Sequence, residues 1–395
     1  MSETEQAQEK VSESRAWLGV LALAFGAFVF NTTEFIPIAL LSDIGSSFAL
    51  SSTETGIMIT VYAWIVALMS LPLMLLTRQM ERRRLLLLLF AVFVAGHIVS
   101  VAANNFALLL AGRVLIALTH AVFWSITAAL AIRIAPVGKG NKALSLLSLG
   151  SVSAMVLGLP LGRLLGGMYG WRITFAAIAV LALLIALVLA KTLPRLPSVN
   201  SGSLASLPVL LRNQTLLKLY AFTVLLVTAH FAAYSYIEPF VREVAQFSAH
   251  QITILLTLYG VAGFAGPYLF GRFFEQHGKS VFLLAVLTIM LAMLTLQPLS
   301  LSVWAIYAIN IAWGAAFMAI CLAMVARVLR LAANATDVAN AIYSALFNVG
   351  IGGGALLGHY AVLVLGLAAL GWFGGVLAAI ALLLAWHLVQ QTEFQ

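Results

Sequence analysis

The stretch FALLLAGRVLIALTHAVFWSITAALAI, residues 106–132, decides the fold. It holds a single charged residue, Arg113, among side chains that are mostly apolar. An α-helix needs about 20 consecutive apolar residues to cross the hydrocarbon of a bilayer. This stretch is long enough, so we predict a membrane-spanning helix that carries one charge into the lipid layer.

The composition of the whole chain points the same way. Of its 395 residues, 63% are hydrophobic and 9% are charged, and the mean hydropathy is +1.07. A soluble domain is about half apolar and about a quarter charged. A water-soluble core is too small to hide this much apolar surface, so lipid must cover the rest. The lone Cys321 excludes an intramolecular disulfide, and we interpret it as core filler rather than a metal ligand.

Apolar runs separated by polar breaks occur twelve times along the chain. The predicted spans are roughly 16–41, 55–76, 84–103, 106–132, 141–166, 171–191, 215–242, 249–273, 280–298, 301–329, 336–364 and 368–390. Only Asn104 and Asn105 mark the boundary between the third and fourth spans. We therefore predict an all-α integral membrane protein with 12 transmembrane helices.

The widest break, 192–214, contains Pro194 and Pro197 and falls after the sixth span. It predicts two pseudo-symmetric six-helix bundles, 16–191 and 215–390, joined by a cytoplasmic linker. A glycine-rich segment supports this division, because 158–166 is echoed by 350–358 at an offset of 192. Paired halves around a central site are a known transporter architecture.

The basic residues set the expected orientation. With the N-terminus inside, 17 of the 21 basic residues fall on the cytoplasmic side. The acidic segment 1–15 lacks the basic start and apolar core of a signal peptide, so we predict a cytoplasmic tail there and another at 391–395. Topology thus accounts for the net charge of +8, and we expect no nucleic-acid partner.

Polar side chains recur on one face of several spans. Arg113, His120 and Trp124 are spaced by seven and four residues, which places them on one side of a helix. His230, Tyr234 and Glu238 are spaced by four and four, and Asn31 and Glu34 by three. Such groups are costly in hydrocarbon and usually face a cavity or a partner.

We predict a central cavity near the membrane midplane, where transporters of paired halves bind substrate. Its predicted lining is Asn31, Glu34, His120, Trp124, His230, Tyr234, Glu238 and Asn348. Amide, imidazole and hydroxyl groups would form hydrogen bonds with polar groups of a substrate, and an aromatic ring would cover an apolar face of it. The alternative is that these groups only hydrogen-bond between helices, and for Trp124 simple packing is an equal alternative.

Several motifs resemble those of the major facilitator superfamily. Its loop signature appears after the eighth span as Gly271, Glu275, Gly278 and Lys279, whereas the loop after the second span keeps the basic residues but not the glycines or the acid. Arg113 matches the intramembrane arginine of proton-coupled members. The fifth span resembles the antiporter motif, with its Gly-Pro pair split as Gly158-Leu-Pro160.

Longer segments resemble the bacterial sugar efflux transporters of the SotB type. They are Phe30-Asn-Thr-Thr-Glu-Phe35, His120-Ala-Val-Phe-Trp-Ser-Ile-Thr127, Tyr234-Ser-Tyr-Ile-Glu-Pro-Phe240 and Ala335-Thr-Asp-Val-Ala339. This resemblance covers almost the whole chain. It implies proton-coupled export of sugars such as arabinose and thiogalactosides, by a monomer in a bacterial inner membrane, with the proton gradient in place of a cofactor.

Coupling to protons requires a group whose proton affinity changes with access. Glu34 and Arg113 fall at similar depths in their spans, so we hypothesise that Glu34 carries the proton and that Arg113 pairs with it in one state. Glu238 is the second candidate, and His120 and His230 are alternative titrating groups.

The loop motifs predict a cytoplasmic latch that holds an outward-open state. We expect Glu275 near the start of the fifth span, where Lys142 and the helix dipole favour a carboxylate. In the other half, Asp337 would pair with Arg82 or Arg83. The alternative is that these arginines serve only to set topology.

Two other functions stay open. A broad drug/proton antiporter shares the motif of the fifth span, and a passive facilitator or channel would need neither Glu34 nor Arg113. An enzyme lacks support, because the chain has no Walker loop, no HExxH and no GxSxG.

Overall fold

The structure is a computed structural model that describes residues 13–198, 207–332 and 336–391. The side chains of Asn141, Pro267, Glu275, Thr336 and Asp337 are outside this description, as are most of the predicted N-terminal tail, residues 392–395 of the C-terminal tail and the middle of the linker. Within the described residues, twelve helical segments are long and apolar enough to cross a membrane.

The helices of the first half are α2 (Glu13–Ala39), α3 (Leu41–Ser47), α4 (Ser52–Thr77), α5 (Arg82–Val101), α6 (Phe106–Ile134), α7 (Gly140–Ser153), the π-turn η1 (Ala154–Gly158), α8 (Leu159–Tyr169) and α9 (Trp171–Thr192). Those of the second half are α10 (Leu207–Leu210), α11 (Gln214–Tyr234), α12 (Ile237–Pro239), the π-turn η3 (Phe240–Val244), α13 (Ala249–Gly263), α14 (Ala265–Leu296), α15 (Val303–Leu331), α16 (Thr336–Leu365), the 3₁₀ turn η4 (Leu367–Ala369) and α17 (Leu370–Val389).

The predicted spans are confirmed, with ends that differ by only a few residues. The predicted boundary between the third and fourth spans is confirmed as the start of a helix. The side chain of Asn105 caps α6 by accepting a hydrogen bond from the amide of Leu108 at 2.8 Å. One predicted loop is different. The segment between the eighth and ninth spans is largely helical within α14, and its backbone departs from helical angles at His277.

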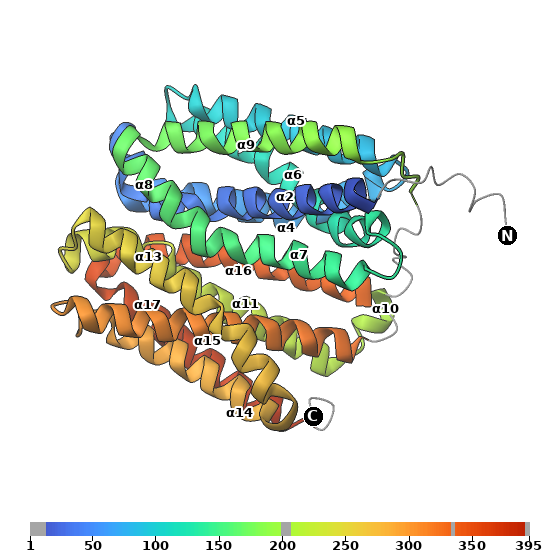
Figure 1. Cartoon of the computed structure of the whole chain (residues 1–395). Helices are drawn as coiled ribbons and strands as arrows, with labels where there is room; N and C mark the ends of the chain where they lie inside the picture. The colour runs from blue at the N-terminus through green and yellow to red at the C-terminus, as the bar shows by residue number, and fades with distance from the viewer. Residues whose placement is uncertain (1–12, 199–206, 333–335, 392–395) are drawn as a thin grey trace.

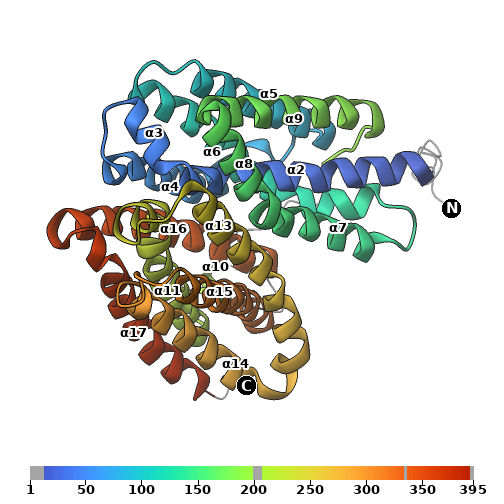
Figure 2. The ribbon, with the colours of Figure 1, turned by 60° about the vertical axis from the view of Figure 1, so that its left-hand side comes forward.

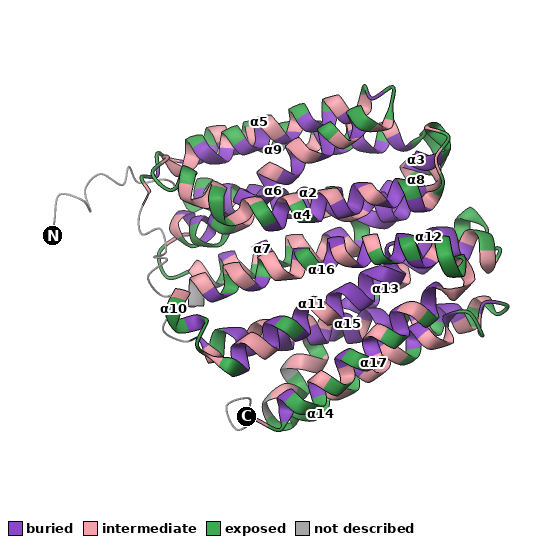
Figure 3. Cartoon of the chain, turned by 180° about the vertical axis from the view of Figure 1, so that it is seen from behind, coloured by how far each residue is buried: buried purple, intermediate pink, exposed green. Residues whose placement is uncertain are grey.

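The two sets of six spans form two bundles that lie side by side (Figure 1). They meet where α4 packs along α16 and where α13 packs against η1 and α8, as Figure 2 shows from another side. We call the end at which α2 begins and α17 ends the proximal end. The opposite end, where α3 and α12 lie, is the distal end (Figure 3).

Glycines explain the echo between 158–166 and 350–358. A Cβ at Gly158, Gly162 or Gly166 would come within 2.4 Å of Thr32 and Ile36 on α2 or of Leu40, which directly follows α2. In the second half, a Cβ at Gly350, Gly354 or Gly358 would come within 2.7 Å of atoms on α11. Small residues let helix backbones approach closely where lipid supplies no hydrophobic drive. Each half therefore packs its fifth span tightly against its first.

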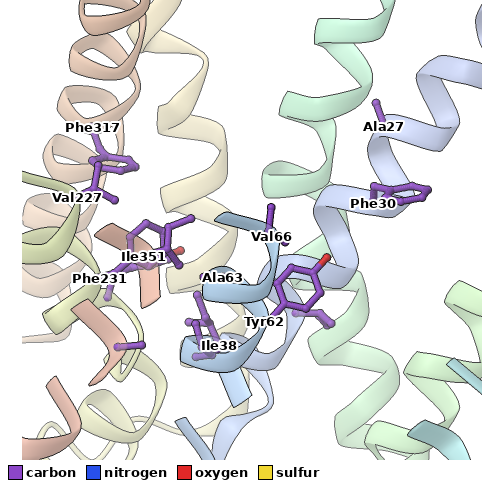
Figure 4. Packing of buried hydrophobic residues seen from close by; sticks show 14 of the residues in the cluster. Ala27, Phe30, Ile38, Tyr62, Ala63, Val66, Val227, Phe231, Phe317 and Ile351 are labelled. Atoms are coloured by element: carbon purple, nitrogen blue, oxygen red, sulfur yellow. The ribbon is translucent and has the colours of Figure 1, made fainter. Parts of the chain in front are cut away.

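The outward faces of the helices are apolar, as lipid contact requires. Leu76, Trp304 and Leu383 are 77%, 81% and 72% exposed, and the buried residues gather on the faces between helices (Figure 3). The core continues across the boundary between the bundles, where Ile38 and Ala63 of the first half lie near Phe231 and Ile351 of the second (Figure 4).

The start of the linker is fixed to the first half by Glu81. Its carboxylate accepts hydrogen bonds from the amides of Arg83 and Arg84, both at 2.9 Å, and from that of Leu196 at 2.6 Å. Partial burial raises the pKa of Glu81, but these amides and the charge of Arg83 outweigh that effect and lower it below its usual value of 4.5. The loop after the second span, which lacks the usual acid of the loop signature, thus uses a different acid to hold the linker.

Replacing Glu81 by Gln should therefore lower stability by about 1 kcal/mol at pH 7, the usual value for a helix cap. Because the pKa is depressed in the folded protein, this stabilisation is present above pH 4.5 and is lost as the pH falls through the folded value. Thermal unfolding in detergent, from pH 7 down to pH 3, measures the difference in stability between wild type and E81Q. Glu243→Gln, at an exposed position, is the control. A stability difference that stays constant over this pH range would contradict the stabilising role of the Glu81 carboxylate.

Candidate functional site

A polar cluster in the first half is centred on His120. The hydroxyl of Tyr62 lies 2.8 Å from its Nδ1, and the indole Nε1 of Trp124 donates to its Nε2 at 2.7 Å. An indole N–H can only donate, so Nε2 must be the acceptor and Nδ1 carries the proton that Tyr62 receives. The carboxylate of Glu34 lies 3.6 Å from the same Nε2. Glu34, His120 and Trp124 are therefore brought together, as the sequence predicts.

Arg113 is placed beside this cluster, on the predicted face of α6. Its Nη1 donates to the carbonyl of Thr33, the residue before Glu34, at 2.7 Å, and its guanidinium lies 4.3 Å from the ring centre of Tyr62. Among the described contacts no ion pair joins Arg113 to Glu34, and the buried Nε and Nη2 atoms of Arg113 have no hydrogen-bond partner. The predicted pairing of these two residues stays a prediction for another conformation.

Thr33 and His97 extend the cluster toward α5. Nδ1 of His97 lies 2.9 Å from the carbonyl of Phe93, so this nitrogen is the donor, and Nε2 accepts from the Thr33 hydroxyl at 2.8 Å. The sequence does not predict a role for Tyr62, Thr33 or His97. Their side-chain partners lie on other helices, so spacing within one span does not identify them.

The second half contains a similar arrangement around His230. Trp313 donates to its Nδ1 at 3.0 Å, and the hydroxyl of Tyr259 lies 3.4 Å from its Nε2. The imidazole stacks on Phe317 with ring centres 3.6 Å apart. Both nitrogens of His230 are thus engaged and it is 1% exposed, so in this conformation it is held as part of the bundle core. Tyr259 and Trp313 were also missed, because aromatic residues in a span do not stand out from its apolar background.

Two buried polar atoms near this second cluster lack a hydrogen-bond partner. They are the hydroxyl of Tyr234 and the Oδ1 of Asn348, on α11 and α16. Leaving such groups unpaired costs about 1–3 kcal/mol each, so they are places where a ligand's hydroxyl groups would be favoured. On the facing half, Asn31 and Trp124 are only partly buried, and Asn31 donates to the carbonyl of Ser151 at 3.4 Å.

Phe35 and Phe231 form an aromatic contact between the two bundles. Their rings stack across the boundary between the bundles with centres 6.2 Å apart. Phe35 follows Glu34 directly, and Phe231 follows His230. This aromatic contact between the halves is therefore formed by the sequence neighbours of two predicted site residues.

Glu238 lies elsewhere, in an ionic cluster at the distal end. Its carboxylate lies 2.6 Å from Arg242 and 3.8 Å from Arg163, and it accepts from the Ser42 hydroxyl at 2.7 Å. Asp43 completes the cluster at 2.5 Å from Arg163 and 3.3 Å from Arg242. Each half supplies one acid and one arginine, and Glu238 is fully buried. The cluster balances its charges and joins the two halves.

The residues of the predicted latch lie at the proximal end. Arg82 donates to the hydroxyl of Ser198 at 2.8 Å, and Arg83 donates to the carbonyl of Ala190 at 2.5 Å. The ammonium group of Lys142 lies 5.0 Å from a ring centre of Trp17. Because the side chains of Glu275 and Asp337 are outside the described residues, their pairing remains a prediction. Among the described residues, the ion pairs between the halves are Arg163 with Glu238 and Arg242 with Asp43, and both lie at the distal end.

A cavity of about 510 Å³ opens at the proximal end between α14 and α15. Its lining includes Gly278 and Lys279 of the loop signature, together with Arg327 and Arg330. It is separate from the clusters around His120 and His230. For the described residues, no group of three or more His, Cys, Asp or Glu side chains is arranged to hold a metal ion.

Substituting Arg163 by Gln should open the distal end, because removing one partner of a buried ion pair costs about 3 kcal/mol. Spin labels at Ser46→Cys and Glu243→Cys, both exposed and one in each half, report the distance across this end in a Cys321→Ala background. We expect a longer distance population in R163Q. R163K retains the charge and should show a smaller change. Identical distance distributions in R163Q and its parent would contradict this role of the cluster.

The chain is similar to known membrane transport proteins. A family model described as the Major Facilitator Superfamily matches residues 23–336. The probable sugar efflux transporter of Mannheimia succiniciproducens is 51% identical over 375 residues, which cover 95% of this chain and 94% of that protein.

Two solved structures share the fold. A D-xylose–proton symporter superposes with a TM-score of 0.77 at 15% identity, over 97% of this chain and 100% of that one. A bacterial homologue of the human lysosomal transporter Spinster, in an inward-facing and occupied conformation, gives 0.73 at 17% identity, over 94% of this chain and 96% of that one.

Proposed function

The chain belongs to the major facilitator superfamily, and from this premise we propose that it exports sugars in exchange for protons by alternating access. The observation that carries the proton part is the contact of Glu34 with His120 at 3.6 Å, inside the first bundle. Buried ionisable residues within spans are costly, and they mark ion and proton pathways. A passive facilitator would not need this carboxylate.

Sugars are the substrate class that the chain supports best. A protein that shares half of its residues, over nearly its full length, is a probable sugar efflux transporter. The unpaired hydroxyl of Tyr234 and amide oxygen of Asn348 suit a ligand rich in hydroxyl groups. Asn31 and the ring of Trp124 would contact it from the first half. We propose arabinose and thiogalactosides as the substrates to test first.

The roles of the remaining predicted residues follow from their positions. We propose that His120 serves the proton site with Glu34 and Arg113, while His230 holds Tyr234 and Tyr259 in place through the second cluster. Glu238 contributes to the distal cluster rather than to sugar binding. This reassignment rests on its full burial among Ser42, Arg163 and Arg242.

Alternating access would then use the two ends of the boundary between the halves. We propose that the distal end faces the outside of a bacterial inner membrane, with both termini in the cytoplasm, and that the distal cluster keeps the outer side closed in this conformation. The predicted latch, Asp337 with Arg82 or Arg83 and Glu275 with Lys142, would close the cytoplasmic side in the opposite conformation.

Replacing Glu34 by Gln should abolish uphill sugar movement while leaving sugar binding intact, since the amide keeps the shape of the side chain but carries no proton. Proteoliposomes with an imposed pH gradient and radiolabelled arabinose or thiogalactoside measure this, and we expect accumulation to fall at least tenfold. Glu54→Gln, at the exposed start of α4, is the matched control. Uphill accumulation by E34Q at the wild-type level would show that Glu34 is not the proton carrier.

A drug/proton antiporter is the second candidate. The partly buried ring of Trp124 favours it, because an aromatic surface suits lipophilic cations. The same liposomes distinguish the two. Gradient-driven flux of a lipophilic cation without any sugar flux would support drug export, and sugar flux that ignores the gradient would support a facilitator.

A further inference from the structure

The Nε2 atom of His120 faces two groups that compete for it. Trp124 donates its indole N–H to this nitrogen at 2.7 Å, and an oxygen of Glu34 lies 3.6 Å away. A neutral imidazole nitrogen that accepts a hydrogen bond has one lone pair to offer. The other ring nitrogen is already engaged with Tyr62 at 2.8 Å. The bond from Trp124 therefore requires that no proton occupies Nε2.

We infer that Trp124 is the positioning residue that makes sugar and proton exclude each other. This inference rests on the proposed function and deepens it. A sugar that stacks on the indole would hold the ring against His120 and keep Nε2 without a proton. A proton at this site would break the hydrogen bond from Trp124 and displace the indole ring, so the sugar would lose the surface on which it stacks.

The proton balance is simple in either of two forms. A proton from water adds to the lone pair of Nε2 and gives an imidazolium whose new N–H points toward the Glu34 carboxylate. Alternatively, the proton stays on the Glu34 carboxyl group, which then donates to Nε2. In both forms the lone pair that accepts the indole N–H is taken, either by the added proton itself or by the O–H of the Glu34 carboxyl group, so the bond from Trp124 breaks. When the proton leaves, the indole returns.

The surroundings contain the charges that such a step needs. The titratable and charged groups facing His120 are Glu34 from α2, Tyr62 from α4, Arg113 from the same helix and, through Thr33, His97 from α5. Lys142 on α7 lies over Trp17 instead. Glu34 is the carboxylate within ion-pair distance of His120 among the described residues, so it is the partner for the added proton.

The position of Trp124 suits this role. It lies one helical turn after His120 on α6, so a change of its side-chain rotamer makes or breaks the bond without moving the backbone. Its ring contacts Phe123 edge-on at 5.4 Å and is only partly buried, which leaves surface for a ligand. Because linkage is reciprocal, a sugar that favours the bond must release the proton, as exchange requires.

The second half offers a matched control. Trp313 donates to Nδ1 of His230 at 3.0 Å, which is the same bond in chemical terms. No ion pair of His230 with a carboxylate occurs among the described contacts. Removing the N–H of Trp313 should therefore leave the link between sugar and proton as it is in wild type.

The test compares Trp124→Phe, which keeps a ring but removes the N–H, with Trp313→Phe. Binding of a radiolabelled thiogalactoside to purified protein is measured from pH 5.5 to 8.5, with proton release followed by a pH dye in weak buffer. We expect wild type and W313F to lose at least tenfold in sugar affinity toward acid pH and to release protons on binding. W124F should vary less than threefold and release none. Equal pH dependence in W124F and wild type, or equal flattening in W313F, would overturn the inference.

Two further arms separate this inference from the proposed function. Absence of sugar binding by wild type at every pH would overturn the proposed function and the role of the sugar here. Without sugar, the tryptophan emission of wild type and W313F should change with pH by a component that W124F lacks. If that component is missing, the inference fails even where sugar export is proven. If W124F does not fold, His120→Gln is the second variant, because it removes the Nε2 atom. The sugar affinity of H120Q must then vary with pH as little as is expected for W124F.

Discussion

Inside a bilayer there is no water to complete a hydrogen bond, so every polar group in a span must find its partner within the protein. The arrangement of this transporter follows from that constraint. The imidazoles of His120 and His230 each lie between a tyrosine hydroxyl and an indole N–H, and the distal charges neutralise one another. The few buried atoms left without partners, such as the Tyr234 hydroxyl, are the places where a ligand gains most.

The same constraint explains the tight packing within each half. Without a hydrophobic drive between helices, close contact depends on small residues, and both glycine stripes press the fifth span against the first. The first span of the first half carries Glu34, and the first span of the second half carries His230. The glycines thus fix the helices that hold the polar clusters.

The sequence predicted the spans well because a membrane helix is recognised by length and hydropathy alone. It also placed Arg113, His120 and Trp124 on one face, since helical periodicity is independent of tertiary contacts. It grouped Glu238 with the sugar site by the same periodicity. Of its partners, Arg242 is only four residues further on, but Ser42 and Arg163 are far away in the chain and reach it only through tertiary packing. Tyr62, Tyr259 and Trp313 were missed because they match the apolar background of their spans.

We propose that sugar and protons move in opposite directions through this protein. The decisive measurement imposes a sugar gradient across proteoliposomes that have no initial pH gradient and contain a pH dye. We expect protons to move against the direction of sugar flow until the sugar concentrations on the two sides are equal. Sugar that equilibrates without any proton movement would rule out proton exchange and leave a facilitator as the explanation.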